Sequence, residues 1–320
     1  MSIELEKSGQ AETSPNVVVI LNSESGKGDT KPSAEKLESL FRARGVPVRV
    51  VTVSGGSDIP RQVEEAIRQP GIECVVAAGG DGTICAVAGA LSKSGIDLGV
   101  LPLGTFNYFA RRFEIPEEVE GAVDAVCHGR TETIDLGSVN GRVFINNASI
   151  GLYPSILKVR EDIYRRWGRS RVAAYWSVVV AMATVYRPLT MSIDIDGRRE
   201  GAKTPTVFVA MSAYQLDEFG IEGSDAVREG KFAVYLAPDC GRVTLMWKAM
   251  RVALSGVKKG QDFALFTGYH AVVSTKRKSQ LIALDGERER MEGPFDFGIL
   301  KDALKVRVPA AAAARPDRAA

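Results

Sequence analysis

Residues 73–83, Glu-Cys-Val-Val-Ala-Ala-Gly-Gly-Asp-Gly-Thr, contain the transition that decides the fold. Their first half is a short, continuous apolar run, which is typical of a strand buried on both faces. Glycines end this strand, and a helix is expected to begin near Thr83. The first N–H groups of a helix have no partner and the helix dipole attracts anions, so the junction predicts a phosphate-binding loop. This loop comprises Gly79, Gly80, Asp81, Gly82 and Thr83.

Gly-Gly-Asp-Gly is also a favourable turn sequence, so a plain turn is the alternative interpretation. The position of the glycines between a strand and a helix favours phosphate binding. There the glycines would let a phosphate approach the main chain, and Asp81 could orient a metal ion or a donor hydroxyl.

The same alternation of strand and helix extends in both directions. Further strands are predicted at 16–22, 46–53 and 97–104, with helical segments between them. This rhythm predicts a parallel, helix-covered α/β domain over residues 15–135. In such a sheet the loops that follow the strands share one edge, where ligands bind. Asn22 begins one of these loops, and Gly104, Thr105 and Asn107 belong to another.

Residues 136–308 have a different pattern, in which closely spaced strands are joined by turn signals such as Asn140-Gly141, Asp196-Gly197 and Asp285-Gly286. This pattern predicts a second, β-rich antiparallel sandwich domain. A return of its last segment to the first domain is left open. Residues 1–14 and 309–320 are predicted to be disordered tails. Strands are expected at 133–150, 189–197, 204–213, 231–237, 262–275 and 279–292, and helical inserts at 155–187 and 241–258.

Composition excludes several classes of protein. The 41 basic and 39 acidic residues nearly balance, so nucleic acid is not an expected partner. The four cysteines are widely spaced, which argues against a disulfide framework or a cysteine metal site. The polar N-terminus has no signal-peptide core, and the longest apolar stretch, 172–185, is shorter than the roughly 20 residues of a transmembrane helix. A cytoplasmic protein is therefore expected, and a homodimer is left open.

Five motifs in order resemble the diacylglycerol kinase catalytic family, which includes bacterial lipid kinases and the sphingosine kinases. The resemblance implies an ATP-binding domain followed by a β-rich domain, with the active site in the cleft between them. It implies transfer of the γ-phosphoryl group of ATP, with Mg²⁺, to the hydroxyl of diacylglycerol or a similar lipid. The motifs are GGDGT (79–83), LPLGTFNYFARRF (101–113), IDLG (134–137), FINNASIG (144–151) and LDGE (284–287).

The resemblance also implies roles for single residues. Glu287 would be the base that accepts the proton of the lipid hydroxyl. Asp285 lies two residues earlier, so on an extended backbone it would face the same side and support Glu287. The alternative is that Asp285-Gly286 is a hairpin turn and Glu287 is the first polar residue of the next strand. The residues expected to contact the nucleotide are Asn22, Thr52, Gly79 to Thr83 and Thr105.

The sequence departs from the family pattern at several positions. Cys85 and Ala86 stand where an Asn and a Glu are common, and Tyr108 replaces an acid. In the second domain a Lys, an Asp and a backbone carbonyl often hold a structural Mg²⁺. The corresponding positions here hold Ala226, Glu229 and Lys231, so Glu229 is the one candidate ligand of a weakened site.

Two segments have features of a membrane-contacting surface. Residues 155–187 combine arginines with tyrosines and tryptophans, which suits an anionic membrane carrying the lipid substrate. Residues 243–257 have apolar residues at helical spacing, and core packing is the alternative for both segments. No lipidation motif is present, so contact should be peripheral and reversible. The basic run 276–278 is interpreted as a solvated hairpin segment.

Two other functions are compatible with the motifs. An NAD kinase-like enzyme shares GGDGT, although LPLGTFN and LDGE favour a lipid kinase. A catalytically silent nucleotide- or lipid-binding protein would explain the departures at Ala86, Tyr108, Ala226 and Glu229. Retention of Asp81, Asp285 and Glu287 argues against it.

Overall fold

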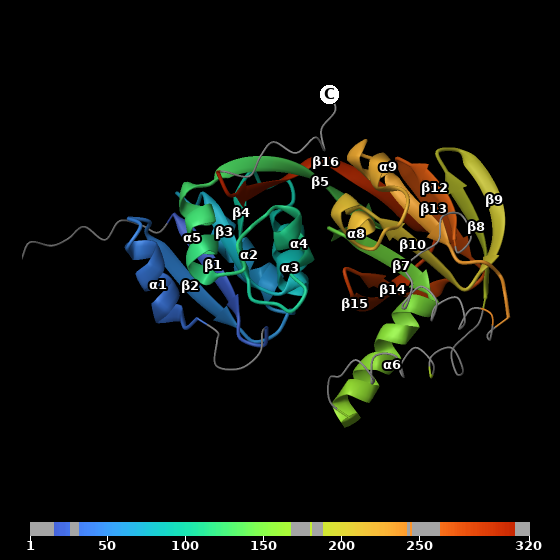
Figure 1. Ribbon diagram of the computed structural model, residues 1–320, viewed down its shortest axis with the longest axis horizontal. Helices are drawn as coiled ribbons and strands as arrows, with labels where there is room; N and C mark the ends of the chain where they lie inside the picture. Colours follow the sequence, from blue (N-terminus) through green and yellow to red (C-terminus); the bar gives the residue numbers. More distant parts are fainter. Residues whose placement is uncertain are drawn as a thin grey trace, which may run out of the picture.

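The computed structural model describes residues 16–25, 32–167, 188–241 and 263–310, and the single residues 180 and 244. These residues form two lobes, one built from the first part of the chain and one from the second (Figure 1). The predicted tail 1–14, most of the tail 309–320, and most of the segments 155–187 and 243–257 lie outside the described residues. Among the described helices, none combines the length and the apolar composition needed to cross a bilayer.

The N-terminal lobe is the predicted parallel α/β domain. Its four parallel strands lie in the order β2-β1-β3-β4. Every residue of β1, β3 and β4 is buried, which explains why these strands are apolar apart from Asn22 and Asp97. The strands are β1 (Val17–Asn22), β2 (Val48–Val53), β3 (Cys74–Gly79) and β4 (Asp97–Pro102), and the helices are α1 (Ala34–Arg42), α2 (Ile59–Ile67), α3 (Asp81–Leu91), α4 (Tyr108–Arg112) and α5 (Val119–His128).

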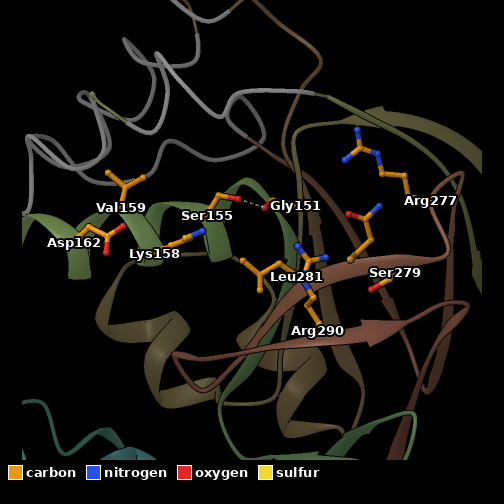
Figure 2. A pocket seen from close by; sticks show the side chains of 10 residues that line it. Gly151, Ser155, Lys158, Val159, Asp162, Arg277, Ser279, Leu281 and Arg290 are labelled. Carbon is orange, nitrogen blue, oxygen red and sulfur yellow. Dashed lines mark hydrogen bonds between the residues drawn. The ribbon is translucent and has the colours of Figure 1, made fainter.

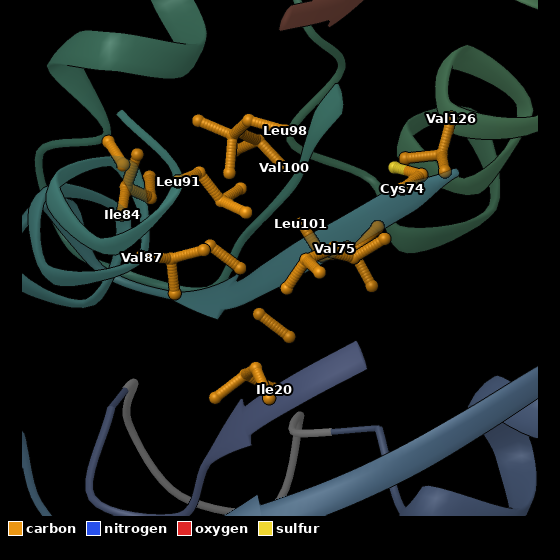
Figure 3. Packing of buried hydrophobic residues seen from close by; sticks show 14 of the residues in the cluster. Ile20, Cys74, Val75, Ile84, Val87, Leu91, Leu98, Val100, Leu101 and Val126 are labelled. Atoms are coloured by element: carbon orange, nitrogen blue, oxygen red, sulfur yellow. The ribbon is translucent and has the colours of Figure 1, made fainter. Parts of the chain in front are cut away.

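Helices pack on this sheet through apolar faces that are set by the 3.6-residue period. In α3, Ile84, Val87 and Leu91 are buried against the strands, as Figure 3 shows. Val126 of α5 belongs to the same core, and it lies near Cys74 of β3. This packing holds the start of α3 at the carboxyl edge of the sheet.

Two long strands join the lobes. They are β5 (Arg130–Val139) and β16 (Phe295–Val308), which pair with each other in antiparallel fashion. One end of β16 pairs in parallel with β4 and the other end pairs with β13 (His270–Thr275). A ten-stranded sheet therefore continues from one lobe into the other. The strand β16 was not predicted from the sequence, and the domain boundary expected at residue 135 falls inside β5.

The C-terminal lobe packs this sheet against a second, antiparallel sheet of six strands in the order β12-β11-β10-β7-β14-β15. The core between the two sheets includes Phe144, Phe232, Phe295 and Phe297. The predicted sandwich is therefore confirmed. Its further elements are β6 (Arg142–Phe144), β7 (Asn147–Gly151), α6 (Leu152–Trp167), β8 (Leu189–Ile195), β9 (Arg198–Thr204), β10 (Thr206–Ala210), α8 (Ala213–Glu218), α9 (Ser224–Arg228), β11 (Phe232–Leu236), β12 (Ala264–Gly268), β14 (Ser279–Leu284) and β15 (Glu287–Glu292).

The three predicted hairpin turns are all present. In each, an Asn or Asp with φ near +48° precedes a glycine with positive φ, as two-residue hairpins require. Segment boundaries were less accurate. The segment 133–150 is divided among three strands, 262–275 between two, and the segment 204–213 ends β9, includes β10 and reaches the start of α8.

Candidate active site

The glycine loop between β3 and α3 is shaped by close backbone contacts. A Cβ built at Gly79 would lie 2.5 Å from Thr83 Oγ1, so no larger residue fits there. A Cβ at Gly104 would lie 2.6 Å from the Cα of Gly80, so the loop after β4 touches the loop after β3. The predicted convergence of these two loops is therefore confirmed, and glycine is required where they meet.

The loop after β1 is tied to the same place. The Asn22 amide Nδ2 donates to Thr83 Oγ1 over 2.9 Å, and Asn22 Oδ1 accepts from the backbone N–H of Glu24 over 3.0 Å. The Ser25 and Thr83 hydroxyls are 3.2 Å apart. Asn22 is buried, so it fastens the first loop onto the start of α3. Thr52 is exposed on the neighbouring strand β2, and residues 26–31 lie outside the described residues.

The loop after β4 is fixed from within by Asn107. This residue has φ +50°, is 2% exposed, and accepts the N–H of Gly104 through Oδ1 over 3.0 Å. Asp81 Oδ1 accepts the N–H of Phe109 over 3.1 Å and so links this loop to α3. Burial raises the pKa of the Asp81 carboxyl, and hydrogen bonds from backbone N–H groups oppose the rise. Thr105 is exposed at the tip of the loop.

Glu287 comes to this loop cluster from the other lobe. A Cβ built at Gly82 would lie 3.1 Å from Glu287 Oε1, so the carboxylate rests on the first turn of α3. The residue is exposed, which leaves the carboxylate open to a substrate. The positive end of the α3 dipole favours a negative group at this position. The arrangement places an accessible carboxylate beside a loop that can receive an anion.

Asp285 has a different environment from Glu287. Its carboxylate accepts N–H groups of Ile145 (2.7 Å), Asn146 (2.7 Å) and Asn147 (3.0 Å). Burial raises its pKa, while these N–H groups and the Cys85 thiol act in the opposite direction. Both carboxylate oxygens are therefore already engaged in fixing the hairpin that carries Glu287.

The expectation of an extended backbone between Asp285 and Glu287 is wrong. Asp285 and Gly286 are the two turn residues, with φ of +48° and +92°, so the backbone between the two acids is not extended. Glu287 is instead the first residue of β15 and pairs with Leu284 across the turn. The hairpin interpretation of Asp285-Gly286 is therefore confirmed.

A cluster of aromatic side chains, which the sequence analysis did not recognise, links the two lobes beside this site. Phe106 and Phe219 are 59% and 50% exposed, unusually high for phenylalanine. The ring of Tyr108 stacks on Phe106 with centroids 5.6 Å apart and lies 6.2 Å from the ring of Phe219. Phe106 lies in the loop after β4 and Tyr108 begins α4, whereas Phe219 follows α8. The aromatic residues within 101–113 could have indicated part of this cluster. The contribution of Phe219 could not be predicted, because this residue is distant from them in sequence.

The residues around Glu229 do not fit the structural metal site that the resemblance implies. Glu229 Oε2 is 2.7 Å from Lys231 Nζ. Lys301 Nζ lies 2.8 Å from Asp135 Oδ2 and 3.4 Å from the carbonyl oxygen of Gly230. Lysine side chains therefore supply the positive charge next to Glu229, Asp135 and the Gly230 carbonyl, where a metal ion was expected. Within the described ranges, no three His, Cys, Asp or Glu side chains are arranged to hold a metal ion.

This architecture, an α/β lobe with a glycine loop joined to a β-sandwich lobe, is that of a solved diacylglycerol kinase from Bacillus anthracis (strain Sterne). The TM-score is 0.68 at 17% identity, over 92% of this chain and 98% of that one. Residues 16–139 match the model of the diacylglycerol kinase catalytic domain. The resemblance in the motifs is therefore confirmed for this part of the chain, which is similar to the diacylglycerol kinase catalytic domain.

Part of the chain is also similar to curated proteins that are named as lipid kinases. The chain is 39% identical over 142 residues to the protein named "Probable lipid kinase YegS-like" of Klebsiella pneumoniae (strain 342), a match that covers 43% of this chain and 46% of that protein. It is 38% identical over 141 residues to the protein of the same name in Yersinia pestis (strain Pestoides F), with the same coverage. The match therefore spans less than half the length of these relatives.

Proposed function

We propose that the protein is an ATP-dependent lipid kinase, which transfers the γ-phosphoryl group to a hydroxyl of diacylglycerol or a similar lipid. The observation that carries this proposal is the contact between Glu287 and Gly82, which sets a carboxylate from one lobe on the phosphate-type loop of the other. The names of the relatives support the same class of reaction.

Phosphoryl transfer requires that the reactants be positioned and that charge be neutralised, and the site has groups for both. The N–H groups at the start of α3 would bind phosphate oxygens, with the loops after β1 and β4 on either side. Mg²⁺ bound with the triphosphate would neutralise the remaining charge. The Asp81 carboxylate lies in this loop and would help to hold the ion, which suits a metal held by one or two carboxylates and substrate phosphates.

Glu287 would accept the proton of the attacking lipid hydroxyl. In support of this role, Glu287 is exposed and its carboxylate lies against Gly82 in the loop proposed to bind phosphate. Asp285 would act as a positioning residue, because its oxygens hold the backbone of residues 145–147. The aromatic cluster of Phe106, Tyr108 and Phe219 would contact the apolar part of the acceptor. That acceptor would be presented at a membrane surface.

The test is transfer of labelled phosphate from ATP to a panel of lipid hydroxyls by the Glu287→Gln variant. We expect turnover to fall by about 100- to 10,000-fold, the usual contribution of a general base, while nucleotide binding is retained. Glu289→Gln is the matched control, because Glu289 lies two residues along β15 and pairs with Arg142 over 3.2 Å. Unchanged turnover by the Glu287 variant would contradict the proposal, and turnover on NAD in place of lipid would identify an NAD kinase-like enzyme.

A further inference from the structure

A pocket of about 370 Å³ lies between α6 and the β14–β15 hairpin (Figure 2). Side chains alternate between the two faces of a strand, so Arg288 and Arg290 of β15 face one side and Glu287 and Glu289 the other. Arg288 pairs with Glu161 of α6, which identifies the first side as the one that faces this helix. The pocket is therefore separate from the candidate active site, on the opposite face of the same hairpin.

The lining of the pocket is basic. Lys158 belongs to α6, Arg290 to β15, and Arg277 to the turn before β14, so the three cations come from different elements. Asp162 is the carboxylate among the lining residues. In the part of the chain that the structure describes, none of the three cations forms an ion pair, whereas Arg288 next to them is paired with Glu161. The lining of the pocket thus contains three cations and one carboxylate, and so has an excess of positive charge.

We propose that this pocket binds a phosphate group. Two of its cations are guanidinium groups, whose paired N–H donors match the oxygens of a phosphate. The Ser279 side chain adds a hydroxyl to the lining, while the Ser155 hydroxyl is already donated to the carbonyl of Gly151. A volume of 370 Å³ exceeds that of a phosphate and leaves room for an attached glycerol-sized group. The phosphate would belong to the headgroup of an anionic phospholipid or to a soluble phosphate ester.

The neighbouring sequence strengthens this assignment. Lys276 and Lys278 flank Arg277 in the turn between β13 and β14, and all three are exposed. Their charges add to the positive potential at the pocket and would draw an anion towards it. The basic run 276–278, which the kinase reaction does not use, is thereby given a role.

The test compares the wild-type protein with the double variant Arg277→Ala, Arg290→Ala, without ATP. Sedimentation with vesicles of phosphatidylcholine containing phosphatidylserine, which has a phosphate but no free alcohol, measures binding to a lipid headgroup. Calorimetric titration with inorganic phosphate and with glycerol 3-phosphate measures binding of the soluble forms. We expect affinity for one of these probes to fall about fivefold for each cation removed, given the usual contribution of a basic residue near an anionic surface.

The matched control is the double variant Arg42→Ala, Lys305→Ala. It removes the same charge from exposed positions on α1 and on the part of β16 that pairs with β4. Loss of vesicle binding in the pocket variant alone would identify a phospholipid as the source, and loss of binding of a soluble probe would identify a phosphate ester. Equal affinities of wild type, pocket variant and control for every probe would overturn the proposal. These readouts need no turnover, so they do not depend on the proposed kinase activity.

Discussion

Glu287 of the β-sandwich lobe rests on Gly82 of the α/β lobe, so that a methyl group at Gly82 would lie 3.1 Å from the carboxylate. The two residues are more than 200 positions apart in sequence. Their contact brings the carboxylate to the glycine loop. A larger residue at position 82 would displace this carboxylate, so its effect on activity tests the position of Glu287.

We expect Gly82→Ala to lower lipid phosphorylation about tenfold, because displacement of a reacting group by 1 Å can cost about 100-fold in rate. The free energy of unfolding should be unchanged or should rise, since alanine favours a helix over glycine by about 0.5–1 kcal/mol. Turnover and urea denaturation measure the two effects. Gly89→Ala is the control, since its methyl group would meet Val143 at an ordinary 3.8 Å. Full activity of Gly82→Ala would show that Glu287 is not held where the structure places it.

The Asp81 carboxyl should make stability depend on pH. Burial raises its folded-state pKa above the ordinary 3.8. The folded protein therefore binds this proton more tightly than the unfolded chain, and the resulting stability is present below about pH 3.8 and lost as the pH rises through the folded-state pKa. Asp81→Asn stays neutral and keeps an acceptor for the N–H of Phe109. We expect it to be more stable than the wild type at pH 7, with the difference vanishing in acid.

Denaturant unfolding across this pH range measures the effect. Asp81→Ala is the companion variant, since it removes the acceptor along with the charge and should lose stability at every pH. An Asn variant that is less stable than the wild type at pH 7 would contradict the prediction.

Lys301 links Asp135 to Gly230, and we expect no metal ion to be needed for this link. A chelator is therefore expected to leave the melting temperature unchanged, measured by calorimetry. Lys301→Ala should lower the free energy of unfolding by about 1 kcal/mol, since the Asp135 carboxylate and the Gly230 carbonyl lose a charged donor. Lys305→Ala, at an exposed position four residues along β16, should have no such effect. A fall in melting temperature on chelation would show that this region does bind a metal.

The aromatic cluster should set the affinity for the acceptor. We expect Phe219→Ala to lower kcat/KM for a long-chain lipid about fivefold to tenfold, because the acceptor would otherwise bury much of this side chain. The KM for ATP should not change, and stability should change by no more than about 0.5 kcal/mol at so exposed a position. Tyr269→Ala is the control, since Tyr269 is equally exposed, at 50%, and lies in β-sandwich residues away from the cluster. An equal fall in kcat/KM in both variants would show that the aromatic cluster does not contact the acceptor.

Much of the fold could be read from short stretches of sequence. The buried strands of the N-terminal lobe are continuous apolar runs, and the turns at 140–141, 196–197 and 285–286 have the residues that positive φ requires. These features depend on local sterics and on the burial of neighbouring side chains, which a window of a few residues records. The glycine loop was predicted for the same reason.

The remaining features depend on contacts between distant segments. The strand β16 pairs with β4 in one lobe and with β13 in the other, and its own sequence does not specify these partners. Asp285 has an unremarkable hairpin sequence, yet the carboxylate holds the N–H groups of residues 145–147.

The candidate site therefore has two origins. The glycine loop and the helix that follows it arise from local backbone preferences, which residues 73–83 encode directly. The meeting of Glu287 with Gly82, and of Tyr108 with Phe219, requires the two lobes to be packed together. Contacts of this kind depend on the pairing of β5 and β16, which joins the two lobes, and no local pattern in the chain specifies them.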